Sequence, residues 1–461
     1  MIAQNMHTIE DTPDGQSSVS TPEVLPSPIE GGMGPSLIES TAEQLADRYA
    51  DLLAMGWRRR TNMLASSAVD FSDLAEFDDR LLAALESLLL LGEPATLRMQ
   101  VSTPDPVRAG EMFAMTLYAL ASDNHEMLDA CQALATAIPD LRVGMVDAFE
   151  WAPATPRIRA RIEALPSSIR LPLVGLRHRD FAGVAQQALE RLQTIQEPTA
   201  AEIVDALQLV QGIGRHDLAT AARRYLDHAV PDVRCAAAQT LLALAPADYT
   251  PAACDTLDQL LSESAVDTGG FRTALRSLTL HAPDRAARHL ETLGQSGEIR
   301  LYLIALGWLG RIGAVPVLIE HLAEPQTARV AAASLSLITG ADPVRDDWQG
   351  PKMALNGPDE LADSEIPVVD PDAHFPWPDA AGFAAWWHVH GPRFDNANRY
   401  FAGRPITPEW LGEVLISGPL AWRPLSAEHL QRLTRGPRFP TRLSAPAQRA
   451  LFQTLTQKGT A

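Results

Sequence analysis

Apolar residues recur every three or four positions along much of the chain, and this spacing predicts helices that bury one face. In the first such stretch, Thr41 stands three residues before Gln44, which is the spacing of a capping box, so we expect the first helix to begin near Thr41. Gly92 ends the second stretch, as glycines often do just beyond a helix. The sequence therefore predicts an N-terminal helical bundle over residues 41–152, with helices near residues 41–63, 72–91, 106–121, 124–136 and 141–151.

From about residue 155 the pattern becomes repetitive, and short helices rich in Ala and Leu follow one another in pairs. An arginine recurs near the start of many second helices, at intervals of 64, 38, 28 and 29 residues: Arg170, Arg234, Arg272, Arg300 and Arg329. These intervals indicate a unit of roughly 30 residues, with the first interval spanning two units. A helix pair that repeats at this period predicts an α-solenoid over residues 153–340, in which each unit buries its apolar face on its neighbours.

One of these units resembles a known repeat. Its residues Asp232 to Ala237 match the Asp-x-Val-Arg-x-x-Ala signature of short HEAT-like repeats. In such repeats the aspartate and the arginine tie successive units together by hydrogen bonds or ion pairs. The resemblance therefore implies a structural role for Asp232, Arg234 and Arg329.

The remaining segments differ from the repeats in composition. Residues 1–40 are rich in Ser, Pro, Gly and Thr without a periodic apolar pattern, which predicts a disordered tail. Residues 341–377 are acidic and Pro-rich, which predicts an irregular linker that lies over the surface. Six of the nine tryptophans follow residue 340, so we expect residues 378–461 to form a helical module rich in Trp and Arg. Within it, Thr407 and Pro408 predict the start of a helix.

Together these segments predict an all-α chain. Its charge and its apolar pattern indicate which classes of partner to expect. The net charge is −19, yet residues 381–461 carry ten bases against four acids. This excess is smaller than a nucleic-acid binder usually carries, so we expect no nucleic-acid partner. The three cysteines lack metal-site spacing, and no apolar stretch is long enough to be a membrane span or a secretory signal. We therefore expect a cytoplasmic protein that does not bind a membrane.

Over residues 41–455 the chain is similar to a proteobacterial family of HEAT-like helical proteins. The resemblance rests on motifs at residues 77–81, 328–331 and 337–340, and on a C-terminal block: Pro376-Trp377-Pro378, Trp386-Trp387, Arg393-Phe394, Arg399-Tyr400, Gly403-Arg404-Pro405 and Trp410-Leu411. After Gly418 the chain departs from the family pattern, so no role of a basic helix is carried over. Genes of this family often lie beside type VI secretion components, which implies an adaptor or chaperone-like accessory of such a system.

The C-terminal block is the candidate site, and two interpretations of it stay open. In the first, its aromatic rings close the end of the solenoid, and its arginines stack on rings or bind backbone carbonyls. In the second, an Arg/Trp surface holds an acidic segment or helix of a partner, because both residue types are common at binding hot spots. The residues concerned are Trp386, Trp387, Arg393, Arg399, Arg404 and Trp410.

The sequence offers no constellation that points to catalysis. It contains no GxSxG elbow and no Cys–His arrangement of a known spacing. His388 and His390 would diverge on a helix, so they are poorly placed to share a metal ion. We expect no catalytic residue, metal or cofactor. The leading hypothesis is a non-enzymatic scaffold that binds a protein partner and has a long surface without a reactive cleft. The alternatives are an immunity protein that inhibits a toxic enzyme, and an enzyme or enzyme subunit on a HEAT-like scaffold.

Overall fold

A computed structural model describes residues 37–459, except 101–106, 154, 167–168, 172, 174–182, 195–197, 246, 267, 354–371 and 373–374. Helices dominate this part of the chain, and its only sheet is a hairpin of two short strands. The prediction of an all-α protein is therefore confirmed. Most of the expected N-terminal tail lies outside the described residues, but its last four residues, 37–40, belong to the first helix.

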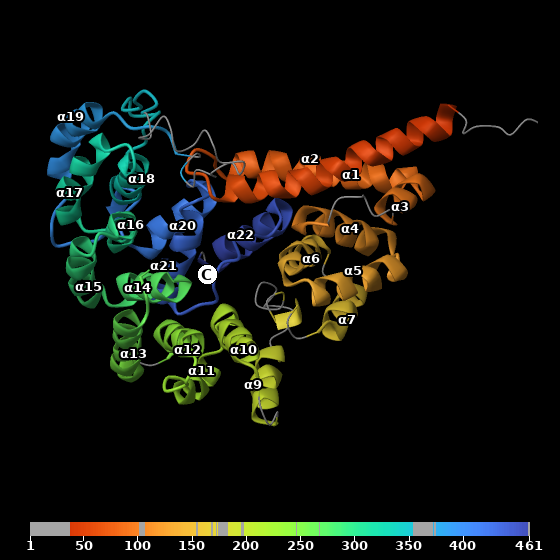
Figure 1. The fold of residues 1–461 in the computed structure, drawn as a ribbon, viewed down its shortest axis with the longest axis horizontal. Helices are drawn as coiled ribbons and strands as arrows, with labels where there is room; N and C mark the ends of the chain where they lie inside the picture. Colours follow the sequence, from red (N-terminus) through yellow and green to blue (C-terminus); the bar gives the residue numbers. More distant parts are fainter. Residues whose placement is uncertain are drawn as a thin grey trace, which may run out of the picture.

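The N-terminal helices form one arm of a curved molecule (Figure 1). α1 and α2 are long, and they pack against each other and against α4. The Asp70 carboxylate caps α2, because it accepts hydrogen bonds from the backbone N–H groups of Ser72 and Asp73. Thr41 lies inside α1, so the predicted capping box is wrong. The helices of this arm are α1 (Leu37–Leu64), α2 (Phe71–Leu91), α3 (Glu93–Gln100), α4 (Ala109–Ser122), α5 (His125–Ala137), α6 (Arg142–Trp151) and α7 (Pro156–Ala164).

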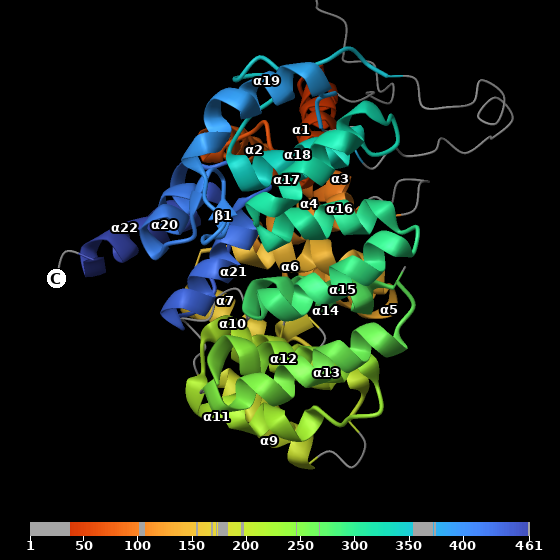
Figure 2. The same cartoon turned by 90° about the vertical axis from the view of Figure 1, so that its left-hand side faces the viewer.

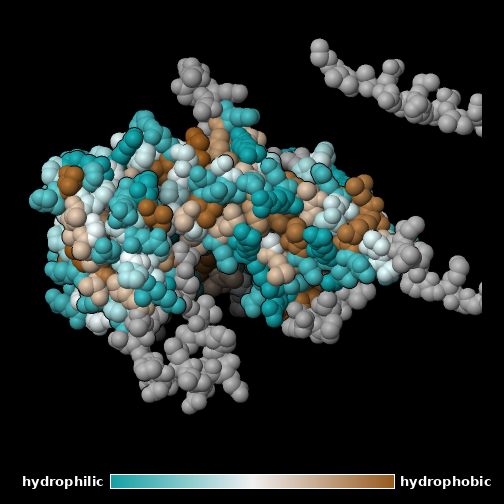
Figure 3. Space-filling view, turned by 90° about the horizontal axis from the view of Figure 1, so that it is seen from above, coloured by the Kyte–Doolittle hydropathy of each residue, from teal (hydrophilic) through white to brown (hydrophobic). Residues whose placement is uncertain are grey.

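The surface of this arm carries several exposed apolar side chains. Seen from above, apolar residues lie among hydrophilic ones over α1 and α2 (Figure 3). Leu90 is 88% exposed and Met55 is 66% exposed, whereas Leu88 is fully buried. In the described part of the chain, none of the helices combines the length and the apolar character needed to cross a bilayer.

The helices from α9 onwards follow one another in pairs and form two layers (Figures 1 and 2). α10, α12, α14, α16 and α18 form an inner layer, in which each helix contacts the next, and α9, α11, α13, α15 and α17 lie outside them. The bounds are α9 (Val184–Thr194), α10 (Ala200–Ile213), α11 (His216–Ala222), α12 (Pro231–Leu244), α13 (Thr250–Glu263), α14 (Gly269–His281), α15 (Pro283–Gln295), α16 (Ile299–Leu309), α17 (Val315–Glu320) and α18 (Ala328–Thr339).

The segment after α18 departs from the expected surface linker. The Trp348 side chain is fully buried, and its ring contacts Phe383 edge-to-face at 5.0 Å between centres. Around it, the backbone N–H of Gly350 donates to Trp377 O at 2.8 Å, and that of Asp379 donates to Trp348 O at 2.7 Å. Residues 341–353 are therefore part of the packed structure, and residues 354–371 of the expected linker lie outside the described residues.

The C-terminal module begins beyond the inner layer and returns into the curve between the two arms (Figure 1). There α20 contacts α2, α21 contacts α12, and α22 contacts α2. The position of α20–α22 means that the module covers part of the concave side of the array. Its elements are α19 (Ala380–His390), β1 (Tyr400–Phe401), β2 (Arg404–Pro405), α20 (Pro408–Ser417), α21 (Arg423–Thr434) and α22 (Ala445–Gly459).

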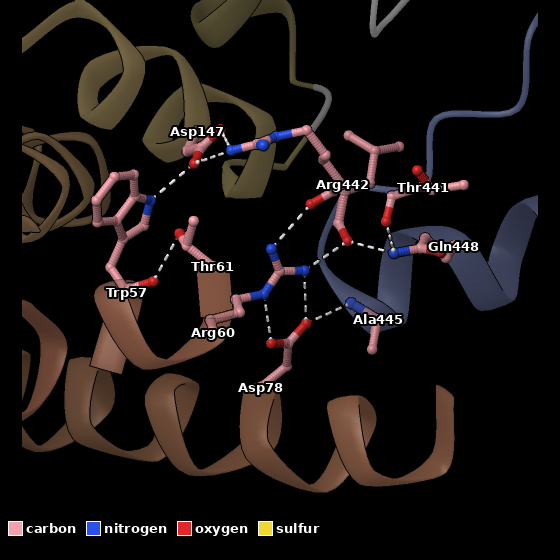
Figure 4. Close-up of polar contacts among 10 residues, drawn as sticks. Trp57, Arg60, Thr61, Asp78, Asp147, Thr441, Arg442, Ala445 and Gln448 are labelled. Atoms are coloured by element: carbon pink, nitrogen blue, oxygen red, sulfur yellow. Dashed lines mark hydrogen bonds and ion pairs between the residues drawn. The ribbon is translucent and has the colours of Figure 1, made fainter. Parts of the chain in front are cut away.

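A buried ion pair between α1 and α2 also holds the residues at the start of α22 (Figure 4). Arg60 of α1 and Asp78 of α2 are almost fully buried, and Arg60 Nε lies 2.7 Å from Asp78 Oδ1. Asp78 Oδ2 also accepts a hydrogen bond from the Ala445 N–H at 2.8 Å. Arg60 donates in addition to Arg442 O at 3.0 Å and to Leu443 O at 2.8 Å. These bonds fix the start of α22 against the N-terminal arm.

The β1–β2 hairpin docks on the ends of two inner helices. Tyr400 N–H donates to Gly310 O at 2.7 Å, and Ala402 N–H donates to Leu337 O at 2.6 Å. Gly310 has φ 68°, and a Cβ there would lie 2.5 Å from Tyr400 O. Glycine at the end of α16 therefore meets two requirements, because it accepts the left-handed conformation and leaves room for the hairpin.

Candidate functional site

The predicted tryptophans of α19 belong to a chain of stacked rings. Trp386 lies 5.7 Å from Phe383 and 4.6 Å from His390 between ring centres. Trp387 stacks on Phe394 at 5.5 Å. Both tryptophans are half-buried and pack against the main core. They therefore cover the end of the array, and only part of each ring is exposed.

Arg399 binds backbone carbonyls at the ends of two successive inner helices. Its guanidinium donates hydrogen bonds to four of them: Leu309 O at 2.8 Å, Thr279 O at 2.7 Å, Trp308 O at 3.3 Å and Leu280 O at 3.5 Å. These carbonyls belong to the last turns of α14 and α16, where the helix dipole favours a cation. Burial lowers the pKa of the guanidinium to about 10. Four of the five N–H donors of this guanidinium are therefore used inside the protein, which favours a structural role over contact with a partner.

Arg393, Arg404 and Trp410 lie closer to solvent. The Arg404 guanidinium lies 4.3 Å from the centre of the Trp410 ring, and its side chain is 62% exposed. Trp410 donates its indole N–H to Phe401 O at 2.7 Å, which holds one edge of the ring in place. Arg393 is exposed and lies over the rings of Trp386 and Phe394 at 5.4 and 4.8 Å. These two arginines combine accessible charge with an aromatic support.

The three residues predicted to tie repeats together differ in what they do. Arg234 donates to Glu263, on the next helix, at 2.6 Å and to His228 O at 3.1 Å, so it joins neighbouring elements. Arg329 is buried, and its guanidinium lies 4.3 Å from the centre of the Trp377 ring. Asp232 is exposed in the first turn of α12 and makes no hydrogen bond or ion pair with another described residue. The predicted tie through Asp232 is therefore wrong, and its carboxylate instead faces the positive end of the helix dipole.

The histidines near the end of α19 do not converge with other metal-binding side chains. His388 is exposed, and His390 stacks on Trp386. Asp372 forms an ion pair with Arg300. Across the residues that the structure describes, no group of three or more His, Cys, Asp or Glu side chains is placed to hold a metal ion.

A cavity of about 880 Å³ lies between the inner layer and the C-terminal module. Side chains of α10, α12 and α14 form one side, and α21 with residues 438–442 forms the other. Trp308, Leu209 and Phe439 contribute apolar wall. The array therefore does not present only an open surface, because it encloses a cavity beneath the C-terminal module. The cavity was missed because its two sides are separated by more than 140 residues, and no local pattern records that they meet.

Arginines dominate the polar wall of this cavity. Glu428 lies between two of them, because its Oε2 accepts from Arg276 Nε at 3.0 Å and its other oxygen pairs with Arg438. The Arg276 and Arg272 guanidinium groups also lie over the Trp308 ring, at 5.6 and 5.7 Å from its centre. Burial lowers the pKa of Arg276, and burial together with the charge of Arg276 lowers the pKa of Arg438 to about 10. The cavity is thus a place where positive charges crowd one another.

Asp205 of α10 lines the same cavity and titrates abnormally. Burial raises the pKa of its carboxyl to about 6, although Arg142 opposes the shift. A raised pKa means that ionised Asp205 costs stability in the folded state, and that this cost grows as the pH rises from about 4 to about 6.

We expect Asp205→Asn to stabilise the protein by about 1–2 kcal/mol above pH 6 and to have almost no effect near pH 4, because the amide stays neutral throughout. Urea unfolding of both proteins between pH 4 and 8 measures the difference. If the difference in free energy of unfolding between the two proteins is constant with pH, or shrinks as the pH rises, the carboxyl of Asp205 does not have a raised pKa in the folded protein.

The three cysteines are buried thiols. Burial raises the pKa of Cys131 to about 11 and that of Cys235 to about 12, and it also raises the pKa of Cys254. Because the thiolate is the reactive form, these side chains are poor nucleophiles at neutral pH.

No protein-family model, curated protein or solved structure matches the chain, so its function has to be inferred from the residues described above.

Proposed function

We propose that the protein is a non-enzymatic scaffold that binds a protein partner, and that the paired helices of residues 153–340 form a HEAT-like α-solenoid. The main support for a solenoid is that hydrogen bonds between neighbouring helix pairs join residues about 30 positions apart in the sequence. Thr240 Oγ1 donates to Leu207 O across 33 residues, and Ser334 Oγ donates to Leu303 O across 31 residues. Each of these bonds lies between adjacent inner helices, which is the nearest-neighbour contact that a solenoid requires.

Ion pairs repeat the same spacing. Arg234 pairs with Glu263 across 29 residues, and His289 lies 2.7 Å from Asp258 across 31 residues. A compact bundle would place contacts at irregular separations, whereas an array of similar units repeats one separation. The interval is close to 30 residues in these four contacts, and it widens to 38 residues between Gln239 of α12 and Ser277 of α14. A repeat of about this length supports an extended array that presents long surfaces.

The exposed arginines of the C-terminal module are the part of the proposed site that a partner can reach. α20–α22 lie on the concave side, so that side is not fully open to a partner. Arg393 and Arg404 are exposed and supported by aromatic rings, and the surrounding residues 381–461 carry ten bases against four acids. An acidic segment or helix is the partner that this charge favours. The setting, an accessory of a type VI secretion system, is supported by the motif resemblance alone.

We expect an Arg393→Ala/Arg404→Ala variant to lose partner binding while its free energy of unfolding falls by less than about 1 kcal/mol for each substitution. The reason is that both side chains are exposed, and the bond that Arg393 makes to the backbone of buried Thr339 is long, at 3.4 Å to Thr339 O. Chemical crosslinking in native lysate, followed by purification and identification of the captured protein, measures binding, and urea unfolding measures stability.

Arg449→Ala is the matched control, since Arg449 is an exposed arginine of the same module on α22. It should capture the same protein as the unaltered chain. Two results would count against the proposal: recovery of no specific protein under several conditions, or equal capture by the double variant. A captured toxic enzyme whose activity falls on binding would support the inhibitor alternative instead.

A further inference from the structure

The side chains that line the cavity beneath the C-terminal module are mainly positive, whereas the net charge of the chain is negative. The protein has a net charge of −19, but five arginines and only two carboxylates line the cavity: Arg272, Arg276, Arg432, Arg438, Arg442, Asp205 and Glu428. Like charges that lie close together around one cavity repel one another. An arrangement of this kind is stabilised when an anion enters.

The internal carboxylates leave part of this charge unpaired. Glu428 is shared between Arg276 and Arg438, and Arg442 pairs with Asp147 at 3.2 Å. Arg272 lies over Trp308, and neither Arg272 nor Arg432 forms a hydrogen bond or an ion pair with another described residue.

Among these arginines, Arg432 gives the strongest evidence for a bound anion. Its Nε is buried and has no hydrogen-bond partner among the described residues. A buried, unsatisfied donor on a cation costs free energy, so native proteins usually supply it with an acceptor. Arg432 also lies close enough to His281 and His429 that its charge helps to lower the pKa of both imidazoles. Those histidines stay neutral and offer no counter-charge.

The size and walls of the cavity indicate a small molecule. Pockets that enclose small ligands commonly measure about 300–1,000 Å³, and this cavity holds about 880 Å³. The arginines supply the planar, paired donors that match phosphate oxygens. Trp308, Leu209 and Leu280 give an apolar wall that suits the organic part of a ligand. A single carboxylate would offset only one guanidinium, whereas a diphosphate group offsets two or more.

We propose that this cavity binds a phosphate-bearing small molecule with two or more negative charges, held by Arg272 and Arg432 together with the Arg276–Glu428–Arg438 cluster. The site is separate from the exposed Arg393 and Arg404, so it does not depend on the protein partner proposed above. The shared chemistry is a diphosphate group, which either inorganic pyrophosphate or a nucleoside diphosphate provides.

Isothermal titration calorimetry with pyrophosphate, ADP and citrate tests the site. The unaltered protein should bind pyrophosphate or ADP with an affinity that weakens at higher salt, because the contacts are ionic. Arg272→Gln/Arg432→Gln, which keeps polar side chains of similar length without their charges, should weaken binding at least about 10-fold. Tighter binding of ADP than of pyrophosphate would identify a nucleotide as the source of the diphosphate.

Arg288→Gln is the matched control, because Arg288 is an exposed arginine of α15 outside the cavity. It should bind as the unaltered protein does. If the double variant does not fold, Arg272→Gln alone should still weaken binding, since Arg272 is exposed and no hydrogen bond depends on it. The proposal is overturned by a lack of saturable binding of both phosphate compounds, by unchanged binding in the variants, or by citrate binding as tightly as pyrophosphate.

Discussion

Replacing Asp78 with alanine should lower the free energy of unfolding by about 3–5 kcal/mol. The side chain is fully buried, so its removal would leave the Arg60 guanidinium in the protein interior without its counter-charge. The Ala445 N–H would lose its acceptor as well. Because these bonds hold α22 to the N-terminal arm, we also expect faster proteolysis of the C-terminal module.

Two controls separate the buried charge from general damage to α2. Arg80→Ala removes an exposed ion pair with Glu76 on the same helix, and it should cost less than about 0.5 kcal/mol. Arg60→Met/Asp78→Leu removes both charges and should cost much less than Asp78→Ala. Burial raises the pKa of Asp78 despite the adjacent Arg60, which means that ionising this carboxyl in the interior is itself unfavourable. Urea unfolding measures the free energy of unfolding of all three variants. A loss below about 1 kcal/mol for Asp78→Ala would contradict the role of this ion pair in holding α22 to the N-terminal arm.

Replacing Arg399 with alanine should lower the free energy of unfolding by about 3 kcal/mol. The guanidinium donates to carbonyls at the ends of both α14 and α16, and those carbonyls would be left without a donor in a partly buried place. The hairpin that follows Arg399 docks on the same helix ends, so its attachment should weaken too. Thermal or urea unfolding measures the loss, and hydrogen exchange of the Tyr400 amide reports the hairpin.

Arg399→Lys distinguishes the geometry of the guanidinium from its charge. A lysine ammonium is a compact point charge and cannot reach the ends of two helices as a planar fork does, so we expect it to restore only part of the stability. Arg404→Ala serves as the control for a nearby exposed arginine, and it should have little effect. Full rescue by lysine would contradict the assigned bonds.

The sequence predicted the features that depend on a few adjacent residues. The second expected helix, residues 72–91, matches α2 within one residue at its start, and the expected stop at Gly92 is where α2 ends. Thr407 caps α20 as predicted, since its Oγ1 accepts from Trp410 N–H at 3.3 Å. Apolar spacing and capping residues act over one or two helical turns, so they can be found without knowledge of the fold.

Contacts between distant segments could not be predicted in this way. Trp348 stands in an acidic, Pro-rich stretch, and only the pairing of residues 348–350 with residues 377–379 shows why it is buried. The Arg60 pair with Asp78 is local, but its bonds to Arg442 and Leu443 span more than 380 residues. The cavity arises from the same return of the chain, which is why its arginines were not recognised as a group.

The hairpin had a local signal that was overlooked. Ala402 and Gly403 both have positive φ values, 50° and 86°, which is the conformation of a tight two-residue turn between antiparallel strands. Glycine at the second position is common in such turns. The two-residue strands were too short for an alternating pattern, so the surrounding arginines and aromatics suggested a helix or loop instead.

The C-terminal module returns between the two arms and contacts the turn between α1 and α2. Ala421 N–H donates to Ser66 O at 3.0 Å, which places the two Cα atoms within reach of a disulfide. A Ser66→Cys/Ala421→Cys variant should therefore form an intramolecular disulfide on mild oxidation, whereas Ser66→Cys/Ser296→Cys, with the second cysteine at the end of α15, should not. Efficient crosslinking of the first pair alone, seen by non-reducing electrophoresis, is the predicted result. No crosslink in the first pair, or equal crosslinking in both, would contradict it.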